Sequence, residues 1–194
     1  MSAVPKQHYT IEEYIELLKN SDERFEYFNG EVVTLSGGKI AHVRIALSIM
    51  RGLETRLGER PCEVFSNDMA LKVPRALPFR YADASVVCGE PIVEPFHGID
   101  MLVNPLVIVE VLSPSTEAYD VETKFWEYQS IASFQEYVLV RQDRPHITHY
   151  LRQGPGQWLR TDIAGLEDSV AFPSLEISLP LNEIYRRVVF ATRS

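Results

Sequence analysis

The stretch Pro105-Leu-Val-Ile-Val-Glu-Val-Leu112 is the most hydrophobic segment of the chain and decides its fold. Glu110 is its only polar residue, so the segment lacks the alternation of a strand with one wet face, and it predicts a central strand covered on both faces. Ser113-Pro114-Ser115-Thr116 ends this strand. A helix is expected from Glu117 to Ile131 and another strand from Glu136 to Arg141. Strand, helix and strand in this order predict a parallel βαβ crossover.

The flanking sequence predicts that this unit belongs to a mixed sheet. Expected before it are a helix from Tyr9 to Lys19 with a capping box at Thr10 and Glu13, a hairpin from Phe25 to Leu35 turning at Asn29-Gly30, a helix from Ile40 to Leu57, and strands at Cys62–Phe65, Met69–Val73 and Ala84–Val87. Expected after it are a β-meander from His146 to Leu179 and a short helix from Leu181 to Arg187. The predicted fold is therefore α/β (α+β), with one mixed central sheet flanked by helices, an N-terminal hairpin and a C-terminal β-meander, in a single domain over residues 1–194.

The second of these helices carries an apolar stripe at helical spacing. Its members are Ile40, Val43, Leu47, Met50, Leu53 and Leu57, and Gly58 follows where a helix C-cap is expected. The stripe and the cap together predict a helix over residues 40–57.

Composition excludes several classes of protein. The chain has 194 residues, 45% of them hydrophobic and 24% charged, which is ordinary for a globular protein. No run approaches the ~20 apolar residues that cross a bilayer, and MSAVPKQHYT lacks the apolar core of a secretory signal, so no membrane location is expected. The two cysteines, Cys62 and Cys88, are too few for a disulfide framework, so we expect free thiols and a cytoplasmic location.

The net charge of −8 disfavours loose, non-specific binding to nucleic acid. It is compatible with a local basic patch, or with a carboxylate-rich site whose charge a divalent cation offsets. The pair Arg186-Arg187 has two readings, a charge effect at a helix C-terminus or part of a small DNA-facing patch.

Three residues are candidates for chemistry, and each has a plainer explanation. Glu110 lies within a strand that looks buried, where a carboxylate needs a metal, a proton or a structural ion pair. Asp83 opens the strand at Ala84, as a turn residue or as a second carboxylate near a cation such as Mg²⁺. Lys124 shares a helix face with Asp120 and Tyr128, either as a surface ion pair or facing the end of the Glu110 strand.

The order of several motifs resembles one known family. FEYFNGE (25–31) is followed by Ala41-His42, YADASVV (81–87), LVIVEVLSPST (106–116), D-x-x-x-K-x-x-x-Y (120–128) and EYVLV (136–140). Over about residues 10–180 this pattern is similar to the restriction-endonuclease-like family called Uma-two, a branch of the PD-(D/E)XK superfamily. EVLSPST and the D-x-x-x-K-x-x-x-Y that follows it are its most specific part.

The resemblance implies roles for individual residues. Asp83 would be the motif aspartate and Glu110 the second carboxylate, both binding Mg²⁺ or its substitute Mn²⁺ together with the backbone carbonyl of Val111. Leu112 stands where the superfamily usually has its lysine, and Lys124 matches the place from which such members supply it. His42 matches a characteristic histidine of less defined role. Glu31 and Tyr128 match recurring positions that are structural, and Ala82 replaces the usual proline before the aspartate.

These residues lead to two hypotheses from different classes. The first is a Mg²⁺-dependent endonuclease acting on DNA, with Asp83, Glu110, Lys124 and His42 as catalytic residues and with assembly into a two-fold dimer. The alternative is a catalytically weak or inactive nuclease fold that acts as a nucleic-acid-binding or interaction module. Other chemistries are disfavoured: His146 and His149 would point to opposite faces of a strand, and there is no serine-hydrolase elbow or phosphate-binding glycine loop. Gly37-Gly38 is expected to be a loop.

Overall fold

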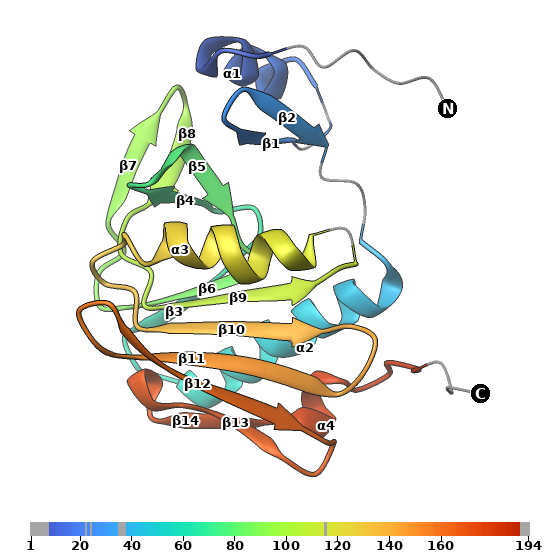
Figure 1. The fold of residues 1–194 in the computed structure, drawn as a ribbon. Helices are drawn as coiled ribbons and strands as arrows, with labels where there is room; N and C mark the ends of the chain where they lie inside the picture. Colours follow the sequence, from blue (N-terminus) through green and yellow to red (C-terminus); the bar gives the residue numbers. More distant parts are fainter. Residues whose placement is uncertain (1–7, 22, 24, 35–37, 115, 191–194) are drawn as a thin grey trace.

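A computed structural model describes residues 8–21, 23, 25–34, 38–114 and 116–190, and a six-stranded mixed sheet lies at its centre (Figure 1). The strand order is β12 (Gln157–Ala164), β11 (His146–Gly154), β10 (Glu136–Arg141), β9 (Val107–Leu112), β6 (Ala84–Cys88) and β3 (Cys62–Ser66). All six residues of β9 are buried, and β9 runs parallel to β10 and antiparallel to β6. The predicted central strand and the βαβ crossover are confirmed.

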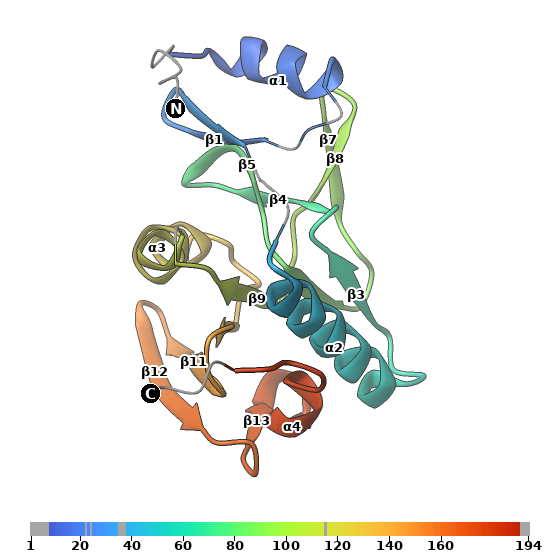
Figure 2. The same ribbon diagram turned by 90° about the vertical axis from the view of Figure 1, so that its right-hand side faces the viewer.

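The side chains of β9 alternate between two cores. Val107, Val109 and Val111 pack in the same cluster as residues of helix α2 (Ile40–Leu57). Ile108 and Leu112 pack in a second cluster together with Tyr128. Figures 1 and 2 show α2 and the helix after β9 on opposite faces of the sheet. Glu110 therefore points to the face covered by the helix that carries Lys124.

This crossover helix differs from the expected one in length and in geometry. It covers residues 117–128, whereas the prediction ran on to Ile131. Half of its length, η1 (Tyr119–Lys124), is a π-helix, and residues 117–118 and α3 (Phe125–Tyr128) have α geometry. A π-helical turn inside a helix is rare and is often found at a functional site.

Helix α2 begins and ends as predicted, but its apolar stripe is buried only in its C-terminal half, at Leu53 and Leu57. Its buried residues are Ile45, Ile49, Gly52, Leu53 and Leu57, whereas Ile40, Val43 and Leu47 are exposed. The helix has apolar residues around most of its circumference, so periodicity alone does not select the face. Packing determines the buried face at Gly52, which lies against strand β14. A Cβ added to Gly52 would lie only 2.5 Å from Leu179 Cδ1, so there is no room for a side chain.

Smaller elements surround the sheet. The predicted first helix with its Thr10–Glu13 capping box and the hairpin at Asn29-Gly30 are confirmed as α1 (Ile11–Lys19), β1 (Phe25–Phe28) and β2 (Glu31–Thr34). A second sheet, with the order β5 (Ala76–Tyr81), β4 (Ala70–Val73), β8 (Ile99–Leu102), β7 (Val93–Phe96), was expected only in part. Of the predicted meander, only β11 and β12 pair in the main sheet, where β11 lies next to β10. β13 (Ser169–Phe172) and β14 (Ile177–Pro180) pair separately, joined by η2 (Pro173–Leu175), and α4 (Leu181–Ile184) follows.

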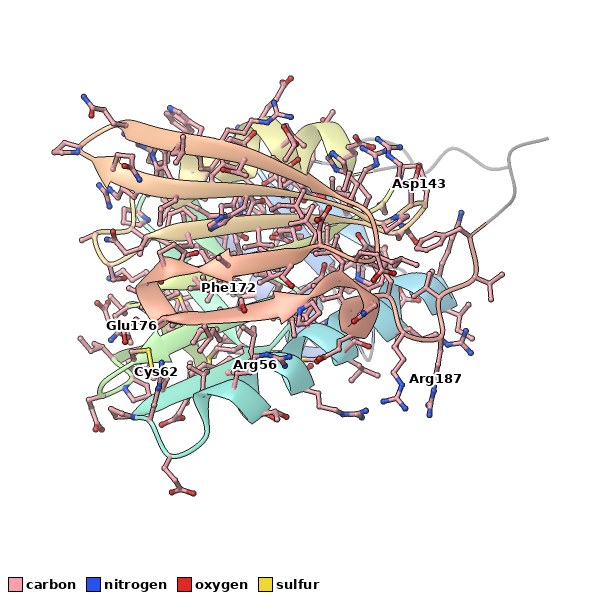
Figure 3. All side chains as sticks on the ribbon, turned by 90° about the horizontal axis from the view of Figure 1, so that it is seen from below. Arg56, Cys62, Asp143, Phe172, Glu176 and Arg187 are labelled. Atoms are coloured by element: carbon pink, nitrogen blue, oxygen red, sulfur yellow. A yellow bond between two sulfur atoms is a disulfide. The ribbon has the colours of Figure 1, made fainter. Side chains whose placement is uncertain are left out.

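The two cysteines correct the expectation of free thiols. Cys62 of β3 lies opposite Cys88 of β6 in the antiparallel register, and the two form a disulfide, seen beside the Cys62 label in Figure 3. Their sequence separation of 26 residues concealed this pairing, which the strand register creates. The expectation of a reducing compartment rested on free thiols and loses that support. Among the described residues, no helix combines the length and the apolar character needed to span a bilayer.

Candidate active site

Asp83 lies between β5 and β6, beside the end of β9. Its Oδ2 accepts a hydrogen bond from the backbone N–H of Val111 at 2.7 Å. Its Oδ1 lies 2.8 Å from Nε2 of His42, near the N-terminus of α2. Asp83, Val111 and His42 are thus brought together from the turn between β5 and β6, from β9 and from α2.

Glu110 and Lys124 meet on the other face of β9. Lys124 Nζ donates to Glu110 Oε1 at 3.0 Å, and Tyr128 Oη donates to the same oxygen at 2.9 Å. Lys124 Nζ also donates to the backbone carbonyl of Tyr81 at 3.2 Å, two residues before Asp83. The prediction that Lys124 reaches Glu110 from the crossover helix is confirmed as geometry. Tyr128 is fully buried and holds Glu110 in place, as expected of a packing residue.

Asp120 joins this group from the π-helical segment. Its Oδ1 lies 3.4 Å from Lys124 Nζ, and both side chains are buried. The Asp120 carbonyl accepts a hydrogen bond from Tyr137 Oη at 2.9 Å, which anchors the segment to β10. The Asp120, Lys124 and Tyr128 side chains therefore face one region, although the helix between the first two is not α-helical.

Glu26 is a member of this group that the sequence did not indicate. It lies on β1, is only 4% exposed, and has its Oε1 3.9 Å from Lys124 Nζ. That oxygen is buried and has no hydrogen-bond partner. Glu31, named from the family motif, is exposed instead. The sequence did contain a signal for Glu26, because it is a glutamate among the aromatic residues of the short strand FEYF. A charged side chain in such surroundings costs free energy unless it is paired.

An ion pair fixes β1 over the site. Arg80 of β5 forms two hydrogen bonds of 2.8 Å to the two carboxylate oxygens of Glu127, and both side chains are buried. Nη1 of Arg80 donates to the backbone carbonyl of Tyr27, the neighbour of Glu26, at 2.9 Å. Arg80 thereby joins the hairpin, the second sheet and the crossover helix.

The pKa values in the site reflect a shortage of positive charge. Burial raises the pKa of Glu110 well above its ordinary value, and Asp120 and Asp83 add to this, while Lys124 lowers it only in part. Burial also raises the pKa of Asp120. Burial lowers the pKa of Lys124, but Glu110, Glu26 and Asp120 outweigh that and hold it well above its ordinary value. The raised pKa values of the carboxylates and the raised pKa of Lys124 are consistent with each other, because one ammonium group is shared among three buried carboxylates.

His42 is a second group beside the carboxylates that can carry a positive charge. Burial lowers its pKa, but the hydrogen bond to Asp83 and the charges of Asp83 and Asp120 outweigh burial and raise it. A hydrogen bond with the Val111 backbone raises the pKa further. His42 therefore faces both groups that the resemblance assigns to the metal, the Asp83 carboxylate and the Val111 backbone.

The side chains differ in how far they can be reached from solvent. Those of Glu110 and Lys124 are 6% and 7% exposed, whereas those of Asp83 and His42 keep 13% and 21% of their surface. A ligand would therefore meet Asp83 and His42 first, with Glu110 and Lys124 behind them.

The donors fit a hard divalent cation. No three His, Cys, Asp or Glu side chains of the described residues already form a metal-ligand cluster. Mg²⁺ does not require one, because it is commonly held by one or two carboxylates and completes its shell with waters and phosphate oxygens. Glu110 of β9 and Asp83, in the turn before the neighbouring strand β6, supply two carboxylates, and the nearby Glu26 Oε1 receives no hydrogen bond.

The histidines that were set aside lie in separate pairs. His149 Nε2 lies 2.6 Å from Glu136 Oε2, and His146 Nε2 lies 3.6 Å from Asp162 Oδ1. The expectation that they do not share a metal agrees with these contacts. Of the Gly37-Gly38 pair, Gly37 lies outside the described residues.

A family model, two protein sequences and a crystal structure are similar to this chain. Residues 11–182 match the family described as "Uma2: Putative restriction endonuclease". Two uncharacterised proteins of Synechocystis sp. are similar: sll1609 is 32% identical over 87% of this chain and 94% of its own length, and slr1290 is 30% identical over 92% of each. The crystal structure of "a putative nuclease belonging to DUF820" from Anabaena variabilis has a TM-score of 0.73 and 16% identity, covering 93% of this chain and 99% of that one. At this identity the likeness shows the fold.

Proposed function

The chain belongs to the Uma2 family, and we propose that it is a Mg²⁺-dependent endonuclease that hydrolyses DNA phosphodiester bonds. The observation that carries this proposal is the contact of 3.0 Å between Lys124 Nζ and Glu110 Oε1, beside Asp83 at the end of β9. It joins a lysine of the crossover helix to a carboxylate of β9, and Asp83 is close enough for its charge to raise the pKa of Glu110. Carboxylates that hold a divalent cation and a lysine near the attacking water would together support phosphodiester hydrolysis.

In this proposal Asp83 and Glu110 bind the cation with the Val111 carbonyl, and Mn²⁺ can replace Mg²⁺. A bound Mg²⁺ would polarise the attacking water and bridge to a phosphate oxygen. Lys124 orients that water and offsets the charge that develops on the phosphate, since its ammonium is a compact point charge. Tyr128 keeps Glu110 in position by its hydrogen bond of 2.9 Å.

His42 and Glu26 have supporting roles in this scheme. A protonated His42 balances Asp83 while no cation is present, and it must release Oδ1 when one binds. Glu26 adds a carboxylate that keeps Lys124 charged and receives no hydrogen bond at Oε1. Both residues therefore tune the charge of the site.

A nuclease assay tests the proposal. Supercoiled plasmid and duplex oligonucleotides are incubated with Mg²⁺, with Mn²⁺ and with EDTA, and cleavage is expected only with the metals. Asp83→Asn, Glu110→Gln and Lys124→Met should each abolish it, whereas Asp100→Asn, on an exposed residue of β8, should not. Isothermal titration with Mn²⁺ should show binding that Asp83→Asn and Glu110→Gln remove. Unchanged binding in both variants would exclude them as ligands.

The burial of the site favours a second candidate function. Glu110 and Lys124 are 4% and 6% exposed and are paired with each other, and the chain has a net charge of −8. A weak or inactive nuclease fold that binds nucleic acid or a protein partner would keep such a closed pair. This alternative predicts duplex binding without cleavage in any metal.

A further inference from the structure

An arginine-rich surface lies on the outer side of α2, and neither the family resemblance nor the catalytic scheme uses it. Arg44, Arg51, Arg186 and Arg187, here called the arginine cluster, line a cavity of about 100 Å³ together with Leu47 and Ser48. Arg51, Arg186 and Arg187 are exposed, and Arg44 is half-buried. Figure 3 shows the Arg187 side chain reaching outward beside the N-terminal half of α2.

The arginine cluster has no internal counter-charge. Among the ion pairs of the described residues, none joins these four guanidinium groups to a carboxylate, whereas Arg56 on the same helix pairs with Glu183 at 2.8 Å. Gathering four positive charges without an acid is unfavourable unless an anion binds between them. The chain has a net charge of −8, yet no acidic residue of the described part forms an ion pair with the arginine cluster.

The backbone is held so that the arginines converge. Arg187 has φ 67, in the left-handed region that is costly for a residue with a side chain. Arg44 Nη1 donates to the Arg187 carbonyl at 2.7 Å and fixes this turn against α2. A strained residue maintained by a specific hydrogen bond is typical of a site that binds a ligand.

The spacing of the cluster suits a row of phosphates. Arg44 and Arg51 lie seven residues apart, so they share a face of α2 about 10 Å apart along its axis. Successive phosphates of one DNA strand are separated by at least the rise of about 3.4 Å per nucleotide, so two arginines this far apart can reach different phosphates. Guanidinium groups bind phosphate oxygens through paired N–H donors, which makes arginine the favoured residue for such contacts.

The cluster is close to the catalytic site but separate from it. His42, which contacts Asp83, is two residues before Arg44 and therefore about 3 Å away along the helix axis. The two side chains leave α2 in nearly opposite directions, because two residues turn a helix by about 200°. One end of α2 thus reaches the site, and its outer face carries the arginine cluster.

We propose that the arginine cluster binds backbone phosphates of duplex DNA beyond the phosphate that is cleaved. This inference rests on the proposed nuclease function for its choice of DNA as the anion. It explains how an acidic protein holds a polyanion, and it selects the DNA-facing reading of Arg186-Arg187. Because phosphate contacts carry no sequence information, this binding is independent of base sequence.

Duplex binding without cleavage tests the inference. Fluorescence anisotropy measures the affinity for duplexes of two unrelated sequences, in EDTA, at several salt concentrations. We expect Arg51→Ala and Arg186→Ala each to weaken binding about two- to fivefold, as for exposed charge pairs. Each substitution should also make the plot of log affinity against log salt concentration less steep, by about 0.9. Arg160→Ala is the matched control, since it removes an exposed arginine of β12 that pairs with Asp162.

The outcomes separate this inference from the nuclease proposal. Weaker binding and a lower salt slope in Arg51→Ala and Arg186→Ala, with Arg160→Ala unchanged, support the arginine cluster even if the protein cleaves nothing. Equal effects in all three variants would show only a general charge effect and would overturn the inference. Absence of wild-type duplex binding at low salt would overturn it too. Cleavage that depends on Asp83 and Glu110, with no effect of the arginine variants on binding, would refute the cluster and leave the nuclease intact.

Discussion

Replacing Lys124 by methionine should destabilise the protein far more than replacing an exposed lysine. Lys124 Nζ lies 3.0 Å from Glu110, 3.4 Å from Asp120 and 3.9 Å from Glu26, and all four side chains are buried. Removing the one ammonium group leaves the carboxylates without their counter-charge. Removing one partner of a buried ion pair costs about 3–5 kcal/mol. For a chain of 194 residues this corresponds to a fall in Tm of roughly 6–20 °C.

The assay is urea unfolding at neutral pH in EDTA, with the disulfide intact. Lys72→Met is the control, because Lys72 pairs with Glu94 at the surface, where such pairs contribute about 0–1 kcal/mol. The double variant Lys124→Met/Glu110→Gln should regain at least 1 kcal/mol of the loss, since it removes one of the unbalanced carboxylates. A loss in Lys124→Met no larger than in Lys72→Met would refute the view that Lys124 balances buried charge.

Three further predictions concern other parts of the molecule. Glu26→Gln should reduce Mn²⁺-dependent cleavage about tenfold without lowering the free energy of unfolding, because it removes a negative charge whose Oε1 receives no hydrogen bond. Glu12→Gln on the exposed side of α1 should change neither quantity. Cys62→Ser/Cys88→Ser should lower the free energy of unfolding by about 3–4 kcal/mol, from the loop of 26 residues that the disulfide closes. A thiol titration of the unreduced, denatured wild type that finds two free thiols would contradict the pairing. The protein is expected to form a two-fold dimer, which light scattering giving the monomer mass over a broad concentration range would disprove.

The parts of the fold that the sequence predicts are those set by local pattern. The apolar run around Glu110 can only be a strand covered on both faces, and the capping box at Thr10 and the Asn29-Gly30 turn specify their elements by their own chemistry. The face of α2 could not be predicted in this way. Its apolar residues extend around the helix, and the contact of Gly52 with Leu179, from a strand more than a hundred residues later, decides the matter.

Features that depend on partners distant in the sequence were missed for the same reason. The pairing of Cys62 with Cys88 follows from the register of β3 against β6, which no spacing rule contains. The second sheet is built from strands of four to six residues, two of which contain a proline, so each resembles a loop. The place of Glu26 in the site becomes apparent only from the contact between the hairpin and the crossover helix. The catalytic candidates could be named because a family pattern linked them, whereas charge and periodicity left each at best evenly balanced with a structural role.

The molecule itself contains the comparison that separates a structural ion pair from the proposed site. Arg80 and Glu127 are buried close to Lys124, and each carboxylate oxygen of Glu127 receives its own guanidinium hydrogen bond of 2.8 Å. That pair is complete, with one cation for one anion, as a buried pair must be in order to fold at tolerable cost. Lys124 instead faces three carboxylates, and one oxygen of Glu26 receives no hydrogen bond. Packing requirements alone give no reason for such an excess, since a single carboxylate would satisfy the lysine. An additional cation bound beside Asp83 and Glu110 would supply the missing charge, and so would a proton on Glu110, whose pKa burial raises. The Mn²⁺ titration of the wild type against Glu110→Gln separates these two ways of balancing the site.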